Sequence, residues 1–227
     1  MNCQIVHDSW HARGFTQSYL FCVADAAVGY GSVGASGGGP KTIVKEFFVL
    51  ARYRDVALPL FRRLVAASGA TTIAAQTNDL LLSAILKSCT VDATSETILF
   101  ADAVVTHLDA PDVRLRPIRM LDRFRMFRHT VEPVGDWGLE LESKIVATGG
   151  LLFHYNPPYG DIYMEVAEPY RRRGYGSFLV QELKRICHEG GHVPAARCDQ
   201  GNAGSRLTLQ KAGMTPCGTI VTGRLAD

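Results

Sequence analysis

The architecture of this chain can be read outward from one stretch, Glu165-Val166-Ala167-Glu168-Pro169-Tyr170-Arg171-Arg172-Arg173-Gly174-Tyr175-Gly176-Ser177. Apolar and polar residues alternate over residues 161–166, as they do in a half-buried strand. Pro169 ends this strand because its ring nitrogen cannot donate to a sheet ladder. From Phe178 onward apolar residues recur at helical spacing until Gly190-Gly191, which end the helix. The stretch therefore predicts a strand, a short turn, a glycine-rich loop and a helix in direct succession.

The loop before this helix has the features of an anion site made of main chain. Gly174 and Gly176 leave backbone amides uncovered, and the loop opens onto a helix N-terminus with orphan N–H groups and a partial positive charge. The arginines at 171–173 add positive potential and side-chain donors for phosphate. A glycine pair alone is a weak signal, so the interpretation depends on the surrounding sequence.

A second motif follows about 26 residues beyond Gly176. Asn202-Ala203-Gly204-Ser205 opens a short helix that ends before Gly213-Met214, and the apolar run at 193–198 precedes it as a strand. The order is strand, Arg-x-x-Gly-x-Gly, helix, strand, Asn-x-x-Ser, helix and strand. In this order and spacing, residues 113–227 resemble the GNAT superfamily of acyl-CoA-dependent N-acyltransferases.

The resemblance implies acetyl-CoA as the cofactor. The arginine–glycine loop would surround the pyrophosphate with main-chain amides, and the strand ending at Val166 would pair with the pantetheine arm near a splay between two parallel strands. Asn202 and Ser205 would touch the arm or the phosphates. The implied cofactor-binding residues are Val166, Arg171, Arg172, Arg173, Gly174, Tyr175, Gly176, Ser177, Asn202 and Ser205.

The sequence departs from the family pattern at Leu209. Many members have a tyrosine at this place in the second helix, which protonates the departing thiolate. Leucine has no proton to give. Another group or water would have to take that role.

Transfer from a thioester to an amine needs a group that takes the proton from the amine. Glu165, nearest the implied pantetheine position, is the first candidate, and Tyr163 shares the polar side of its strand. His154, at the end of the preceding strand, has an imidazole with a suitable ordinary pKa. A salt-bridged strand carboxylate and a packed loop histidine remain open as ordinary roles for Glu165 and His154.

The acceptor pocket, by the same resemblance, would be built from a helix predicted over residues 120–130 and the loop after it. Two carboxylates and an indole there would suit a cationic amine through ion pairing and a cation–π contact. A capped turn beside a core tryptophan is the ordinary alternative. The candidate acceptor residues are Glu132, Asp136, Trp137 and Tyr155.

Composition excludes several classes of protein. With 47% apolar residues, 20% charged residues and a net charge of +2, the chain reads as an ordinary soluble protein without bulk attraction to nucleic acid or anionic lipid. The arginines at 114–128 are spread over several faces, which favours a solvated surface over a nucleic-acid site. The six cysteines are scattered without a Cys-x-x-Cys pair, as core thiols are in a reducing compartment. No signal peptide or membrane-spanning run is visible, so we predict a cytoplasmic protein without metal.

The first half repeats this order of elements. At an offset of 117, Tyr53-Arg54 corresponds to Tyr170-Arg171, and Phe61 corresponds to Phe178. At the same offset, Ala57 and Pro59 stand where the second half has its two loop glycines. A methyl group crowds the phosphate and proline has no N–H, so this half would have lost its cofactor loop. An unrelated α/β domain with a coincidentally similar order is the alternative.

The sequence thus predicts an α/β fold of two tandem GNAT-like mixed-sheet halves with flanking helices. Residues 1–110 would be the degenerate half and residues 111–227 the acyl-CoA-binding half. The predicted function is an N-acetyltransferase that acts on a primary amine of a small molecule or peptide by direct transfer. A non-catalytic acyl-CoA sensor is the alternative, favoured by Leu209, and a structural protein that binds no coenzyme A is a second one.

Overall fold

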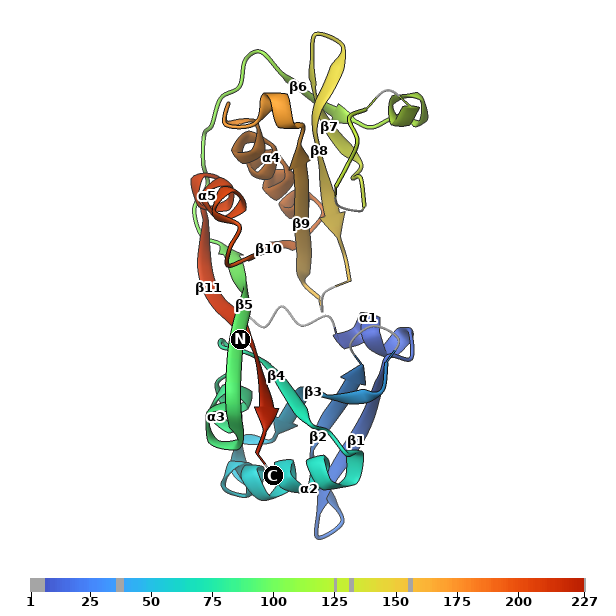
Figure 1. Ribbon diagram of the computed structural model, residues 1–227, viewed down its shortest axis with the longest axis vertical. Helices are drawn as coiled ribbons and strands as arrows, with labels where there is room; N and C mark the ends of the chain where they lie inside the picture. Colours follow the sequence, from blue (N-terminus) through green and yellow to red (C-terminus); the bar gives the residue numbers. More distant parts are fainter. Residues whose placement is uncertain (1–6, 36–38, 125, 131–132, 155–156, 227) are drawn as a thin grey trace. The chain divides into compact units, whose positions relative to one another are not determined.

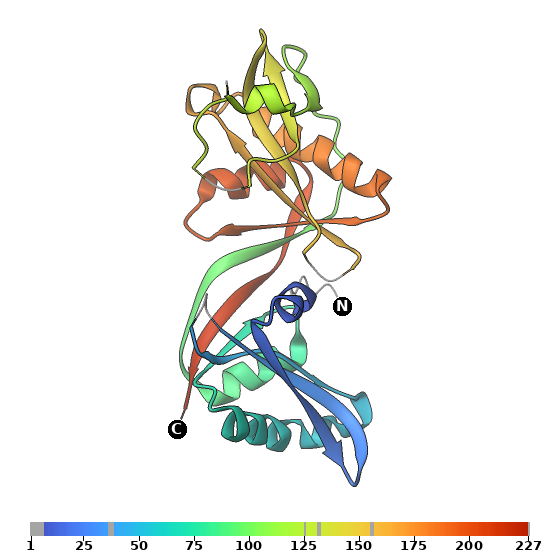
Figure 2. The same ribbon diagram turned by 90° about the vertical axis from the view of Figure 1, so that its right-hand side faces the viewer.

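A computed structural model describes residues 7–35, 39–124, 126–130, 133–154 and 157–226 (Figures 1 and 2). The chain forms two compact units. Unit 1 consists of residues 1–98 together with 218–227, and unit 2 consists of residues 99–217. Among the described residues the strands belong to one mixed sheet with flanking helices, which agrees with the predicted α/β class. The arrangement as two tandem GNAT-like halves stays a prediction.

Unit 1 contains α1 (His7–Ala12), β1 (Thr16–Val23), β2 (Ala26–Ala35), β3 (Lys41–Val49), η1 (Ala51–Val56), α2 (Ala57–Ser68), β4 (Thr72–Gln76), α3 (Leu80–Cys89) and most of β5 (Thr90–Asp102). Strands β1, β2 and β3 are antiparallel neighbours, and β4 joins β3 in parallel. The last strand of the chain, β11 (Met214–Leu225), pairs antiparallel with β4 through Ile220 to Arg224. Unit 1 is therefore built from both ends of the sequence.

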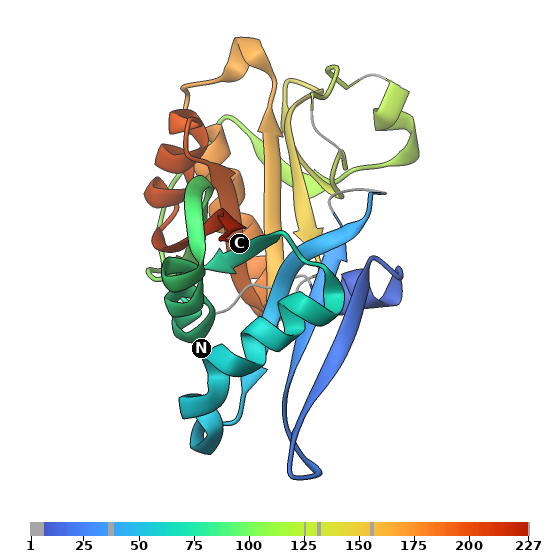
Figure 3. The same ribbon diagram turned by 60° about the horizontal axis from the view of Figure 1, so that its bottom comes forward.

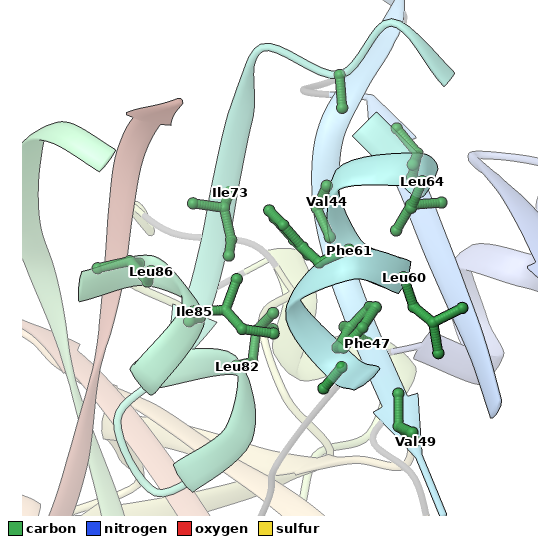
Figure 4. Close-up of a cluster of buried hydrophobic side chains, with 14 of the residues drawn as sticks. Val44, Phe47, Val49, Leu60, Phe61, Leu64, Ile73, Leu82, Ile85 and Leu86 are labelled. Atoms are coloured by element: carbon green, nitrogen blue, oxygen red, sulfur yellow. The ribbon is translucent and has the colours of Figure 1, made fainter. Parts of the chain in front are cut away.

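The core of unit 1 lies between its sheet and helices α2 and α3. Helix α2 crosses the strands in Figure 3, and Figure 4 shows its side chains meeting those of β3. Phe61 and Phe47 are both buried and pack edge to face, with ring centroids 5.4 Å apart. Leu60 and Leu64 are four residues apart on one face of α2, which is the spacing that an amphipathic helix buries.

Unit 2 contains β6 (Arg114–Pro117), η2 (Met120–Phe124), β7 (Trp137–Leu141), β8 (Lys144–Leu152), β9 (Tyr159–Val166), η3 (Glu168–Tyr170), α4 (Tyr175–Glu189), β10 (Val193–Asp199), α5 (Ala203–Lys211) and the start of β11. Strands β6 to β9 are antiparallel neighbours, and β10 joins β9 in parallel. Leu179, Leu183 and Cys187 are fully buried on α4, at the spacing of one helical face. Figures 1 and 2 show α4 and the turn η2 on opposite faces of β8 and β9.

The predicted helix over residues 120–130 is wrong. Among the described residues of this range, only the 3-10 turn η2 forms, over Met120–Phe124. Asp122 holds this turn from the side, because it accepts hydrogen bonds from the Arg119 amide at 2.7 Å and from the Arg116 guanidinium at 2.6 and 2.9 Å. Phe127 and His129 then stack with their rings 4.2 Å apart, and this segment carries side chains to the sheet. These side-chain contacts take the place of the helical hydrogen bonds that the prediction required.

Burial of the cysteines is only partly as predicted. Cys187 and Cys198 are buried in unit 2, whereas Cys22 is exposed on β1 and is not a core residue. The described cysteines are free thiols. None of the helices in the described ranges is long and apolar enough to cross a membrane.

Candidate functional site

The parallel pairing of β9 and β10 is short. It runs from Tyr159↔Val193 to Asp161↔Ala195, while β9 continues to pair with β8 as far as Val166. Over residues 162–166, therefore, one edge of β9 is not paired with β10 in the described part of the chain. An unpaired strand edge presents N–H and C=O groups that an extended ligand can bind.

The loop that follows β9 presents a group of unsatisfied amides. Arg172 and Gly174 adopt left-handed backbone conformations, with φ of 65° and 89°, and α4 begins directly afterwards at Tyr175. Among the described residues, the backbone N–H groups of residues 172–177 donate to no acceptor. Such donors at a helix N-terminus form an anion site, because the helix dipole adds partial positive charge.

The arginines of the loop have different positions. Arg171 donates from Nε to the carbonyl oxygen of Val166 at 3.0 Å. Arg173 lies over the ring of Tyr170, 5.4 Å from its centroid, and reaches the carbonyl oxygen of Pro169 at 3.4 Å. Arg172 is exposed. Two guanidinium groups thus brace the loop that carries the free amides.

The first turn of α4 is closely packed. A Cβ atom on Gly176 would lie 3.1 Å from the Thr208 methyl group and 3.4 Å from Val166. Tyr175 is buried, and its hydroxyl donates a hydrogen bond to Asp112, which together with burial raises the pKa of the tyrosine. Ser177 is buried as well. The loop is therefore held from both sides while its amides stay open.

Both ends of helix α5 carry polar side chains that belong to the candidate site. Asn202 caps the helix, with its Oδ1 accepting from the Ser205 amide at 2.9 Å, and the Ser205 hydroxyl bonds to the Cys198 thiol. At the other end, the Lys211 ammonium lies 3.9 Å from the point that a Cβ of Gly174 would occupy. No local sequence pattern indicates a role for this lysine, because α5 and the loop meet only in the fold.

Glu165 lies on the sheet face opposite α4. Gly149 pairs with Met164, and a Cβ on Gly149 would be 2.9 Å from Leu183 of α4, so Met164 lies on the helix face and Glu165 on the other. The Glu165 carboxylate accepts hydrogen bonds from the Thr130 amide at 3.0 and 3.2 Å and from the Thr130 hydroxyl at 2.8 Å. The proposed base is thus tied to the segment after η2.

Tyr163 and His154 lie apart from this contact. The Tyr163 hydroxyl lies 2.6 Å from the point that a Cβ on Gly150 would fill, so the ring extends over β8 and away from β10. His154 Nε2 is 3.4 Å from Asp161 Oδ2, and Asp161 is four residues before Glu165. Four strand residues span about 13 Å. The structure therefore does not bring His154 together with Glu165.

Of the candidate acceptor residues, Asp136 and Trp137 belong to the described part of the chain. Trp137 pairs with Gly149, which places its side chain on the α4 face. Asp136 is exposed just before β7, and its carbonyl oxygen accepts from the Ile118 amide at 2.8 Å. Glu132 and Tyr155 lie outside the described residues.

Three polar residues that sequence reasoning did not single out surround Glu165. Besides Thr130, His129 Nε2 lies 2.7 Å from Thr148 Oγ1. Thr148 is buried and pairs directly with Glu165 across β8 and β9. No local pattern announces this cluster, since its hydrogen bonds join residues 19 and 35 positions apart.

The sequence matches one family model, described as the acetyltransferase (GNAT) family, over residues 101–214. This range contains the open edge of β9, the arginine–glycine loop and both helices α4 and α5. None of the curated proteins matches the sequence.

Solved structures share the fold at low sequence identity. An acetyltransferase of the GNAT family from Colwellia psychrerythraea has a TM-score of 0.76 and 16% identity, covering 96% of this chain and 89% of that one. A GCN5-related N-acetyltransferase from Sphaerobacter thermophilus has a TM-score of 0.60 and 14% identity, covering 92% and 80%. A tandem GNAT protein from the clavulanic acid biosynthesis pathway has a TM-score of 0.60 and 13% identity, covering 99% and 89%.

Proposed function

The chain belongs to the acetyltransferase (GNAT) family, and from this premise we propose that it transfers an acetyl group from acetyl-CoA to a primary amine of a small molecule or peptide. The amine nitrogen attacks the thioester carbonyl directly. A C–N bond forms, the C–S bond breaks, and the amine proton passes to a base. The thiolate of coenzyme A leaves and takes a proton from water or a nearby group.

The observation that carries this proposal is the row of free amides at residues 172–177, directly beyond the unpaired edge of β9. Together they fit the two parts of coenzyme A that differ most in chemistry. The amides, with Arg172 and Lys211 beside them, suit the anionic pyrophosphate. The edge up to Val166 suits the amide groups of the pantetheine arm, which can add to the sheet as a short strand does.

The chain's own residues then position the reaction. Anchoring at the loop and the edge places the thioester near the point where β9 and β10 separate, and much of the rate comes from holding both reactants together. The polar face of β9 carries Glu165 and Tyr163, and the group that takes the amine proton is expected on this face of the sheet, with His154 farther along the strand. Asp136 is the described candidate for attracting a cationic acceptor.

Leu209 is buried in α5, and its hydrocarbon side chain has no proton to give to the departing thiolate. A thiol is acidic enough to leave as thiolate near neutral pH without a dedicated donor. This position is also the observation that favours the alternative, a sensor that binds acyl-CoA without catalysis.

We further propose that residues 1–110 form a degenerate GNAT-like half and residues 111–227 the working half. At the offset of 117, Ala57 takes the place of Gly174, and its backbone is helical with φ of −60°, so no left-handed turn opens before α2. Pro59 lacks an N–H. One acetyl-CoA per chain is therefore expected.

A calorimetric titration with acetyl-CoA, followed by a screen of primary amines for release of free coenzyme A, tests the proposal. Binding at one site per chain with thiol release supports the transferase. Binding without release by any amine supports the sensor. Absence of binding would contradict both, and two sites would contradict the loss of the loop in the first half.

A further inference from the structure

The carboxylate of Glu165 is occupied as a hydrogen-bond acceptor. Its two oxygens receive the Thr130 amide at 3.0 and 3.2 Å, and Oε1 also receives the Thr130 hydroxyl at 2.8 Å. These are charge-assisted bonds, which are stronger than bonds between neutral groups. Protonation of the carboxylate would weaken them, so a proton taken by Glu165 would loosen its hold on Thr130.

The hydrogen bonds between Glu165 and Thr130, called the clamp below, hold the backbone beside His129. His129 precedes Thr130, and its Nε2 lies 2.7 Å from the Oγ1 of Thr148, the residue paired with Glu165. Phe127 stacks on the imidazole with centroids 4.2 Å apart and an interplanar angle of 29°. The ring is thus held by the buried threonine, by an aromatic neighbour and by the clamp on its own backbone.

The other ring nitrogen is not used in this way. Within the described residues, Nδ1 of His129 has no hydrogen-bond partner, and the side chain is half-buried. With Nε2 protonated and donating to Thr148, Nδ1 keeps a lone pair that can take a proton. An imidazole is the side chain whose ordinary pKa lies nearest neutrality, which suits a general base.

We propose that His129 is the proton acceptor for the incoming amine, and that Glu165 is a positioning residue that holds His129 through Thr130. This rests on the proposed acetyl transfer. As the amine nitrogen bonds to the thioester carbon, its proton moves to Nδ1 of His129, the thiolate leaves, and the imidazolium then returns the proton to the thiolate or to water. Thr148 holds Nε2 throughout, so the ring keeps its orientation.

The groups that share this sheet face set the electrostatic surroundings of His129. From β9 they are Glu165, Tyr163 and Asp161, and from β7 Glu140, which pairs with Arg116. Asp161 is engaged with His154 and Arg197 farther along the strand. Of these, Glu165 is the charge that lies beside the clamped segment.

The first experiment compares His129→Gln with the wild-type protein, using an amine that the thiol-release screen identifies. Glutamine can keep a bond to Thr148 from the place of Nε2 but offers no base. We expect kcat/KM to fall about a hundredfold or more, the acidic limb of its pH profile to disappear, and the dissociation constant of coenzyme A to stay within about twofold. His107→Gln, at an exposed histidine of unit 2, is the matched control for the substitution itself.

The second experiment separates anchoring from base catalysis at Glu165. Glu165→Gln keeps an oxygen for the Thr130 donors, so kcat should fall less than tenfold and the acidic limb should remain. Glu165→Ala should lower kcat more, and Thr130→Val should do the same while Thr130→Ser retains activity. If Glu165 were the base, Glu165→Gln would not retain most of the activity.

The outcomes are distinguishable. An active wild-type protein whose His129→Gln variant keeps its kcat/KM and acidic limb overturns the role of His129. Equal losses in Glu165→Gln and Glu165→Ala, with the limb gone in both, make Glu165 the base and also overturn the inference. A wild-type protein that binds coenzyme A but transfers to no amine overturns the proposed function together with this inference. Thermal melting of each variant identifies any that fail to fold. If a His129 or Glu165 variant fails to fold, the comparison of Thr130→Val with Thr130→Ser tests the inference instead.

Discussion

Gly174 is the residue on which the anion loop depends. Its φ of 89° lies in the region that costs an L-residue roughly 1 kcal/mol or more. Gly174→Ala should therefore destabilise the fold slightly and weaken coenzyme A binding at least tenfold, because the neighbouring amides must shift. Gly191→Ala is the matched control, since Gly191 has a φ of 77° and open space around it but lies at the far end of α4. Titration calorimetry on both variants checks this, and equal affinities would contradict it.

Lys211 should act through charge alone. Its ammonium lies beside Gly174 on the exposed end of α5, so Lys211→Met should weaken coenzyme A binding by several-fold at low salt and less at high salt, because salt screens exposed charges. Lys144→Met, on an exposed lysine at the start of β8, should leave the affinity unchanged. A loss that does not depend on ionic strength would assign Lys211 a packing role instead.

The buried thiol of Cys187 should make the stability of unit 2 depend on pH in the alkaline range. Burial raises the pKa of this thiol to about 11, with the nearby Asp102 acting in the same direction. The unfolded chain loses this proton at lower pH than the folded chain does, so the stability contribution is complete below the unfolded pKa and is lost as pH rises toward 11. The free energy of unfolding should fall between about pH 9 and 11, and Cys187→Ala should flatten that slope. Cys22→Ala, at an exposed thiol, serves as the comparison in the same denaturant titrations.

The turn η2 is stabilised by the hydrogen bonds of one charged carboxylate. Asp122 receives the Arg116 guanidinium and the Arg119 amide, and these bonds keep the pKa of its carboxyl well below the usual range. Asp122→Asn should speed hydrogen exchange of the Arg119 amide several-fold, since a hydrogen bond to a charged group is stronger than one to a neutral group. Asp109→Asn, at an exposed carboxylate, should leave that amide unaffected. Unchanged exchange in Asp122→Asn would mean that packing alone holds the turn.

The strand, loop and helix around Gly174 could be predicted from sequence because their signals are local. Alternation, Pro169, the glycines and the apolar face of α4 all act within a few residues. The helix predicted over 120–130 failed because Asp122 finds Arg116 across the turn rather than a helical partner. Glu165 was chosen for its place on the strand, but its contact with Thr130 depends on a segment 35 residues away. Contacts between segments so far apart in the sequence depend on the tertiary fold, and no short-range sequence pattern predicts them.

At the scale of the molecule, unit 1 depends on the last residues of the chain. Residues 220–224 pair with β4, and Leu225 is buried in the same core as Ile73 and Phe61. Deletion of residues 218–227 should lower the melting temperature of unit 1 by many degrees or abolish its cooperative melting. The loop at 172–177 lies in unit 2 and should still bind coenzyme A. Removal of Asp227 alone is the control. Calorimetric melting with and without coenzyme A separates the loss of stability in unit 1 from any loss of coenzyme A binding by unit 2.

The same strand sets an order of events during synthesis. Residues 1–98 leave the ribosome before unit 2, yet strand β4 waits for a partner that is translated after unit 2. Until then one edge of β4 lacks its final neighbour, and unpaired strand edges are where nascent chains associate wrongly. Translation of unit 2 thus separates the start of unit 1 from its completion, and a ribosome that stalls within residues 99–217 would hold a nascent chain with its first unit unfinished.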